Sequence, residues 1–268
     1  MVTRPNRQGK ETAVATMPEF IDLVRATPTE PRSGEGDMVV LRDGRLFFAY
    51  ASFRKAADNA VADIVARTSA DGGRSWTAPS VLIPHREARE NVMSVSLRRT
   101  AAGRLLLFYL RKDSISECRA WLRQSTDEAQ TWGEAVCCTP ATRYHVIVNN
   151  CAVQLRDGRL VLPYEVCDAV WTKDERISAA AAVSDDEGRS WRSSNEIYAP
   201  KRGAMEARVI ERRDGSLWML MRTDQGTLWE SSSADRGLTW GRHRAVRVSS
   251  RRRHRSCSRA SRRPATCC

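Results

Sequence analysis

The sequence has no apolar run that approaches the roughly 18 residues needed for a membrane helix. Its first 20 residues include basic side chains but no apolar stretch behind them, which argues against a secretory signal. These two absences predict a soluble, cytoplasmic protein with no membrane partner. The hydrophobic fraction of 41% and the charged fraction of 28% are ordinary for a globular chain, and 268 residues suffice for one large domain or two small ones.

Residues that bind transition metals are also scarce. The chain has only four histidines, and none of its eight cysteines forms a Cys-x-x-Cys pair. This pattern does not favour a zinc site, so we expect no metal and no cofactor. Five cysteines precede Arg242, an odd number that cannot all pair with one another, and we expect reduced thiols.

The positive charge is confined to one end of the chain. The formal net charge is +12, but residues 242–268 hold ten arginines and neither lysine nor an acidic residue. The other 241 residues carry 34 basic and 32 acidic side chains. A nearly neutral body does not predict a nucleic-acid surface, despite the arginine-rich tail.

One octapeptide recurs four times with the pattern Ser-x-Asp-x-Gly-x-Ser/Thr-Trp, and Ala129 replaces the glycine in the second copy. The copies read SADGGRSW, STDEAQTW, SDDEGRSW and SADRGLTW, and their tryptophans are 56, 59 and 49 residues apart. Aspartate can accept hydrogen bonds from the backbone just after it, glycine permits left-handed backbone, and tryptophan packs the turn. We therefore predict a structural role, rather than a catalytic or metal-binding one, for Asp71, Asp127, Asp186 and Asp235.

A second signal keeps the same period. Asp43-Gly44, Asp157-Gly158 and Asp214-Gly215 lie between apolar runs, and Ala102-Gly103 is a weaker fourth copy. Such pairs are typical of tight hairpins, so each repeat is expected to hold a hairpin, a third strand, the octapeptide turn and a fourth strand. Four short antiparallel strands in each period of about 50 residues predict an all-β fold, a β-propeller of four-stranded antiparallel blades.

The octapeptide resembles the Asp box, or bacterial neuraminidase repeat, of sialidases. The resemblance extends over roughly residues 34–242 and includes the segments NVMSVSL, FYLRK, VNNCAVQLRDGRLVLPYE and EARVIERRDGSLWMLMR. It implies a six-bladed propeller of which four repeats are present. The expected organisation is an N-terminal extension (1–33), the propeller (34–247) and an arginine-rich tail (248–268).

The same resemblance implies a sialidase-like exo-glycoside hydrolase that removes terminal sialic acid or a related sugar. Sialidases use a tyrosine nucleophile, and in the family a glutamate acts as its base, an aspartate is the acid/base, and three arginines hold the substrate carboxylate. The alternative is a non-catalytic propeller that binds carbohydrate or protein, since adhesion and receptor propellers also carry Asp boxes.

Three residues match family positions in their spacing and context. Asp58 lies fifteen residues after Asp43, between the second and third strands, where the acid/base aspartate falls. Glu206 opens the first strand of the fourth repeat, and Arg222 ends the next strand sixteen residues later, as the glutamate base and the second arginine do. The alternative interpretation gives them no function: Asp58 would be a solvated loop residue, Glu206 a surface residue and Arg222 the end of a strand. Arg54 is a further candidate near Asp58, and Asn149, Asn150 and Glu165 are candidates in the third repeat.

Other positions depart from the family pattern. The segment that should hold the first arginine reads SGEGDMVV, with Glu35 and Asp37 instead, and an acidic side chain there would repel a sialic-acid carboxylate. The third arginine and the nucleophile belong to later repeats, and none of the five tyrosines matches the nucleophile: Tyr50, Tyr109, Tyr144, Tyr164 and Tyr198. These departures predict an incomplete or altered activity.

The tail beyond the fourth repeat has three interpretations: a nucleic-acid arm, an unselected segment or an out-of-frame translation. Arginine, serine, alanine, proline and cysteine without aspartate, glutamate or lysine favour the third, with a frameshift near Val248. Four blades of an expected six would leave two blade faces and their edges unpaired, so we also expect self-association.

Overall fold

The computed structural model describes residues 20–139 and 141–246, and almost all of their regular structure is β-strand. One short 3-10 helix, η1 (His85–Glu87), is the exception. The predicted all-β class is therefore confirmed. Most of the expected N-terminal extension and all of the arginine-rich tail lie outside the described residues, and so does the proposed frameshift near Val248. None of the helical structure described is long and apolar enough to cross a bilayer.

The first and last repeats each form one four-stranded antiparallel sheet, with the strands in sequence order. The first sheet comprises β1 (Arg32–Val40), β2 (Leu46–Phe53), β3 (Ala62–Ser69) and β4 (Ser80–Ile83). The last comprises β15 (Met205–Glu211), β16 (Leu217–Arg222), β17 (Trp229–Ser233) and β18 (Arg244–Ala245). Both match the strand, hairpin and turn order that the sequence predicts.

The second and third repeats join into one ten-stranded sheet. The second contributes β5 (Asn91–Arg99), β6 (Leu105–Lys112), β7 (Cys118–Ser125) and β8 (Val136–Cys137). The third contributes β10 (Val153–Gln154), β11 (Leu160–Cys167), β12 (Ser178–Ser184), β13 (Arg192–Ser193) and β14 (Ile197–Tyr198). The link is β9 (Tyr144–Val146), which pairs antiparallel with β11 and meets β7 in parallel at Cys118. The total of six blades stays a prediction.

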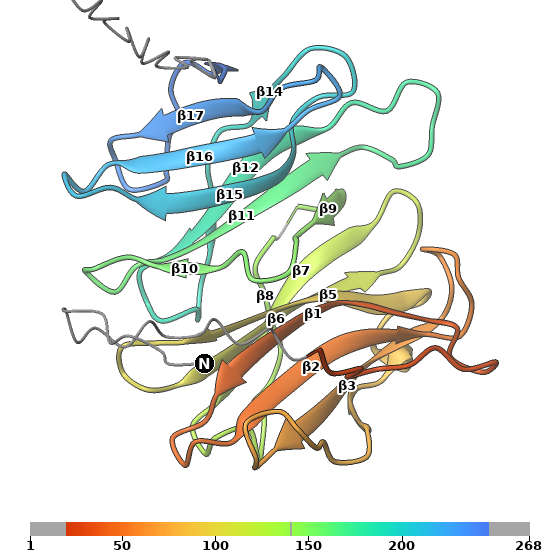
Figure 1. Cartoon of the computed structure of the whole chain (residues 1–268). Coiled ribbons are helices and arrows are strands. Elements are labelled where there is room, and N and C mark those ends of the chain that lie inside the picture. Colours follow the sequence, from red (N-terminus) through yellow and green to blue (C-terminus); the bar gives the residue numbers. More distant parts are fainter. Residues whose placement is uncertain (1–19, 140, 247–268) are drawn as a thin grey trace, which may run out of the picture.

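The repeats follow one another through space in sequence order, with the first and last sheets at opposite ends (Figure 1). Apolar residues fill the space between consecutive repeats in three clusters. Phe47 and Leu107 belong to the first, Phe108 and Leu162 to the second, and Val161 and Met219 to the third. Burial of apolar area between neighbouring repeats is therefore the main force that stacks them.

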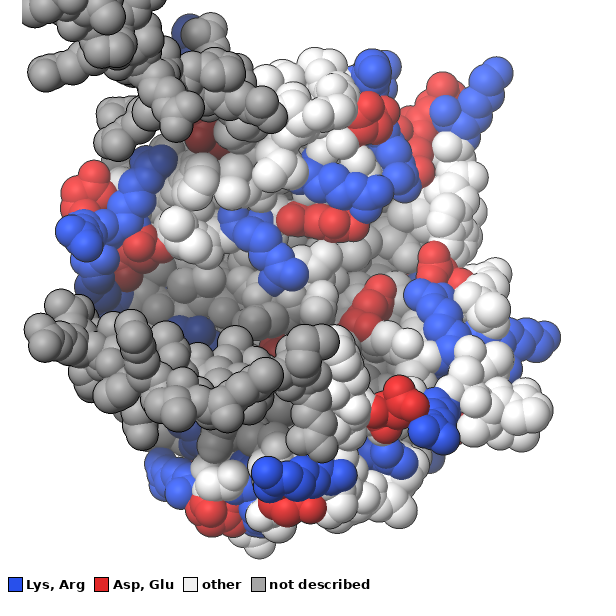
Figure 2. Space-filling model, in the orientation of Figure 1, with Lys and Arg blue, Asp and Glu red and all other residues white. Residues whose placement is uncertain are grey.

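The outer faces of the two end sheets lack such a neighbour among the described residues. Met38 and Val40 of β1 are 42% and 57% exposed, and Ile210 of β15 is 52% exposed. Large apolar side chains exposed in groups are typical of surfaces that associate. The expected self-association through unpaired blade faces stays a prediction. Charges of both signs are interspersed on the face drawn in Figure 2, as the near balance of the body predicts.

The octapeptide turns have the hydrogen bonds that their composition predicts. In the third copy, Asp186 accepts hydrogen bonds from the Ser190 N–H (2.9 Å), the Ser190 hydroxyl (2.5 Å) and the Ser184 hydroxyl (2.8 Å). The Ser184 Oγ in turn accepts the Gly188 N–H at 2.8 Å. The Ser190 hydroxyl and these other donors lower the pKa of Asp186 to about 2. The aspartate is therefore a structural anchor of the turn.

The other three copies repeat these contacts. The second copy keeps them although Ala129 replaces glycine, because Ala129 adopts φ 67° and donates its N–H to Ser125. The tryptophan contacts vary more: Trp76 and Trp191 donate their Nε1–H groups to the backbone of the same turn, whereas the Nε1 atoms of Trp132 and Trp240 have no hydrogen-bond partner among the described residues. The aspartate and serine thus define the turn more strictly than the tryptophan does.

Candidate functional site

Each repeat has a non-glycine residue with left-handed backbone within its first strand or within three residues before it. These residues are Glu35 (φ 53°), Ser94 (φ 59°), Asn150 (φ 49°) and Glu206 (φ 48°). In β1, β5 and β15 the residue lies within a register shift of the sheet, which marks a β-bulge. Bulges re-aim side chains and are common next to functional sites. The same backbone irregularity thus recurs with four side chains, of three different types.

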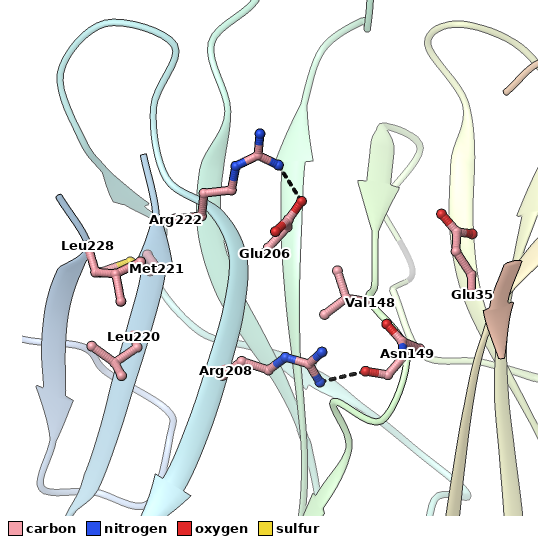
Figure 3. Close-up of a pocket in the computed structure, with 9 residues that line it drawn as sticks. All are labelled: Glu35, Val148, Asn149, Glu206, Arg208, Leu220, Met221, Arg222 and Leu228. Atoms are coloured by element: carbon pink, nitrogen blue, oxygen red, sulfur yellow. Dashed lines mark hydrogen bonds and ion pairs between the residues drawn. The ribbon is translucent and has the colours of Figure 1, made fainter. Parts of the chain in front are cut away.

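Two of these bulge residues, Glu35 and Glu206, line one cavity of about 470 Å³. Figure 3 shows β1 on one side of it and β15 and β16 on the other. The remaining lining residues come from the segment before β10 and from the last sheet: Val148, Asn149, Arg208, Leu220, Met221, Arg222 and Leu228. Leu220 and Met221 of β16 thus give the wall an apolar part, whereas Glu35 and Asn149 provide polar groups on the side of the first and third repeats.

Glu206 and Arg222 meet in this cavity, as their spacing predicts. Met205 pairs with Arg222 across β15 and β16, which brings the neighbouring Glu206 beside the arginine. The Arg222 Nη1 donates to the Glu206 Oε1 at 2.5 Å, and the two side chains are 56% and 47% exposed. This charge-assisted contact fixes a carboxylate and a guanidinium together where solvent and a ligand can reach both.

Arg208 connects the last repeat to the third. Its Nη1 donates to the carbonyl oxygens of Asn149 (2.5 Å) and Asn150 (2.6 Å). The Asn149 amide nitrogen donates in turn to the Gly36 carbonyl of β1 at 3.3 Å. Residues from the first, third and fourth repeats thus converge around the cavity, and no sequence motif indicates the part played by Arg208.

Glu165 lies directly behind Glu206. It is buried on β11, and its Oε1 accepts the Glu206 backbone N–H at 2.5 Å. Burial, together with the nearby Glu206 carboxylate, raises the pKa of Glu165 to about 7, although the hydrogen bond from the Glu206 N–H and the charges of Arg202 and Arg222 act to lower it. Glu165 therefore supports the bulge that presents Glu206, and it does not itself line the cavity.

Asp58 lies in the loop between β2 and β3, outside the cavity lining. Its carboxylate is 61% exposed and forms an ion pair with Arg32, while buried Asn91 donates its side-chain amide to the Asp58 carbonyl at 3.0 Å. Arg32 pairs with Phe53 across β1 and β2 as Met205 pairs with Arg222 in the last sheet. Asp58 and Arg222 therefore lie at equivalent ends of their sheets.

Arg32 is a residue that the sequence reasoning missed. It falls in the expected N-terminal extension, immediately before the segment SGEGDMVV, yet it is the first residue of β1. Because Arg32 lies two residues before the expected start of the propeller, it was not considered among the candidate site residues. Its guanidinium lies over the Phe53 ring at 4.3 Å as well as beside Asp58, so the aromatic ring helps to place it.

The structure places Arg54 away from the cavity. Its Nη2 lies 3.2 Å from the Asp63 Oδ2 and 3.5 Å from the His85 Nδ1. Asp63 also accepts the His85 backbone N–H at 2.7 Å, and these donors lower the pKa of Asp63 against the opposing effect of its burial. Arg54 thus belongs to an ion-pair cluster beside η1. The structure does not bring it together with Glu206 and Arg222.

The segment that lacks the expected arginine is acidic in space as well as in sequence. Glu35 accepts a hydrogen bond from the Ser94 hydroxyl at 2.9 Å, and Asp37 accepts the Leu97 N–H at 2.8 Å. Burial raises the pKa of Asp37. No tyrosine lines the cavity in the part of the chain that the structure describes, and its acidic residues, histidines and cysteines form no metal-binding cluster there.

The fold and the repeated turns define an Asp-box protein with antiparallel β-repeats. A family model described as a BNR repeat-like domain matches residues 44–262, and the chain belongs to this family. No curated protein matches the chain.

Solved structures share the fold at low sequence identity. A protein of unknown function from Dyadobacter fermentans is 16% identical, with a TM-score of 0.68 over 83% of this chain and 71% of that one. A Hadza microbial sialidase is 20% identical, with a TM-score of 0.65 over 82% of this chain and 48% of that one. The intramolecular trans-sialidase of Ruminococcus gnavus, in complex with oseltamivir carboxylate, is 14% identical, with a TM-score of 0.63 over 82% and 71% of the two chains.

These likenesses establish a sialidase-like BNR propeller fold. The chain spans about half of the Hadza sialidase and 71% of the trans-sialidase.

Proposed function

We propose that this chain is part of a sialidase-like exo-glycoside hydrolase that acts on terminal sialic acid or a related sugar. The observation that carries the proposal is the Glu206–Arg222 ion pair, which lies in a cavity of about 470 Å³. That volume is in the range of sites for small organic ligands. The structural relatives named as sialidases and trans-sialidases support the same chemistry.

Each proposed residue has a role that its surroundings permit. Asp58, which reaches solvent from the β2–β3 loop, is the proposed acid/base for the leaving oxygen. Glu206, held by Glu165 and Arg222, is the proposed base, and Arg222 binds the sugar. Arg54 stays a proposed substrate residue only through its sequence position, since its contacts are with Asp63 and His85.

A second function is a propeller that binds carbohydrate without cleaving it. One observation favours it: no tyrosine is among the described residues that line the cavity, and the sialidase reaction uses a tyrosine nucleophile. A binding module needs only the cavity and its hydrogen-bonding groups.

Turnover and binding of the full chain separate the two functions. We expect a panel of fluorogenic glycosides that includes a sialoside to show turnover, which is lost in Asp58→Asn and in Glu206→Gln. Glu134→Gln, which changes an exposed glutamate outside the cavity, is the matched control. Saturable binding by calorimetry without turnover would support the binding module. Neither turnover nor binding would overturn both.

A further inference from the structure

The guanidinium groups around the cavity already have protein partners. Arg222 is paired with Glu206, Arg208 is held by two backbone carbonyls, and Arg32 is paired with Asp58. Each of these contacts uses Nη1 of its guanidinium, and the carboxylates that pair with Arg222 and Arg32 offset the charge of those two groups. Among the described lining residues, two guanidinium groups (Arg208 and Arg222) are balanced by two carboxylates (Glu35 and Glu206), so the lining has no net positive charge to attract an anionic sugar.

Acidic and carbonyl oxygens, by contrast, are plentiful. Glu35 and Glu206 line opposite sides of the cavity in Figure 3, with Asn149 between them. The Asn149 amide nitrogen donates to Gly36, so its Oδ1 remains an acceptor. Carboxylate and amide oxygens accept hydrogen bonds from hydroxyl groups, and sugar hydroxyls are donors of this kind.

The backbone holds Glu35 in this position. Its left-handed conformation lies in the β1 bulge, its Oε2 accepts the Ser94 hydroxyl, and the next residue is Gly36. A Cβ on Gly36 would lie 2.8 Å from the Phe48 ring and 2.9 Å from the Tyr50 Cβ, so a larger residue would push the bulge away. The carboxylate is thus built into the site by its neighbours in β2 and β5.

We propose that, of the two substrates named under the proposed function, the cavity selects a related, uncharged sugar rather than sialic acid itself, and that Glu35 is the residue that rejects anionic sugars. This inference rests on the proposed carbohydrate function and deepens it by naming the substrate class. Glu35 accepts hydroxyl donors of the bound sugar and repels a carboxylate at the same place. Asn149 accepts a second hydroxyl on the side of the third repeat.

A matched pair of probes tests this directly. One is a methyl sialoside, and the other is the same sugar with its carboxylate reduced to a hydroxymethyl group. Calorimetry with the full chain is expected to show at least tenfold tighter binding of the reduced sugar. Glu35→Gln is expected to narrow that ratio to less than threefold, whereas Glu134→Gln leaves it unchanged. Glu35→Gly, which suits the positive φ, provides a second variant should glutamine impair folding.

The outcomes distinguish the inference from the function on which it rests. Binding of neither probe would overturn the proposed carbohydrate function itself. Tighter binding of the sialoside would overturn the substrate class while leaving carbohydrate binding intact. A preference for the reduced sugar that persists in both Glu35 variants would overturn the role of Glu35.

Discussion

The four Asp-box turns and the four left-handed positions at the first strands differ in what is repeated: the turns repeat side chains, and the left-handed positions repeat only a backbone angle. Every turn keeps the same aspartate and serine and the same hydrogen bonds, even where alanine replaces glycine. The left-handed positions keep the backbone angle but hold glutamate, serine, asparagine and glutamate. Repeated side chains therefore mark the architecture, whereas a repeated backbone with varied side chains marks where the repeats specialise.

The largest effect is expected at one of the left-handed positions, Glu206, which lines the cavity. Glu206→Gln should lower turnover about 100-fold or more, because it removes the proposed base and the charge that holds Arg222. The free energy of unfolding should change by less than about 1 kcal/mol, since the pair is half exposed. Steady-state kinetics and urea unfolding measure the two. A loss of stability equal to the loss of activity would contradict the assignment.

The next effect is a pH dependence of stability, expected from Glu165, the buried carboxyl behind the β15 bulge. The pKa of Glu165 is raised to about 7 in the folded protein, so its contribution to stability is complete below about pH 4.5 and is lost as the pH rises through 7. Glu165→Gln should abolish that fall and be more stable than the parent by about 3 kcal/mol above pH 7.5. Urea unfolding from pH 4.5 to 8 measures it; parallel pH profiles of parent and variant would exclude this role.

The next effect concerns the Asp-box turns, whose contribution to the free energy of unfolding should have the reverse pH dependence. Asp186→Ala removes an acceptor of three hydrogen bonds and should cost about 1–3 kcal/mol with unchanged turnover per folded molecule. Because the folded pKa of Asp186 is lowered to about 2, its contribution is present above about pH 4 and is lost as the pH falls through 2. Thermal melts between pH 2 and 6 check this, with Asp168→Ala as an exposed control.

The smallest effect concerns the backbone of the left-handed positions. Asn150 has φ 49°, a conformation that glycine adopts freely, so Asn150→Gly should change the free energy of unfolding by less than about 1 kcal/mol. Asn150→Val should cost about 1–3 kcal/mol, because a branched Cβ is strained there. Equal stability of the two variants in urea would show that the left-handed backbone does not matter.

The sequence could predict features that depend on residues close together in the chain, but not contacts between distant ones. The turns depend on local residues at fixed spacing, so SADGGRSW and its copies indicate both the period and the hydrogen bonds. The Glu206–Arg222 pair also follows from hairpin register. Arg32 and Arg208 could not be found in this way, because their contacts join different strands or different repeats. The β9 link that fuses two repeats into one sheet has no repeated motif, so the separate sheets expected from the period do not form there.

Sugar is expected to bind at the first-strand bulges and not at the outer turns. Backbone amide NMR of the full chain during titration with the reduced methyl glycoside tests this most directly. We expect the largest shift changes at Glu35, Ser94, Asn149 and Glu206, with none at Gly73 or Gly188 in the turns. Changes confined to the turns, or none at the bulges under saturating sugar, would contradict it.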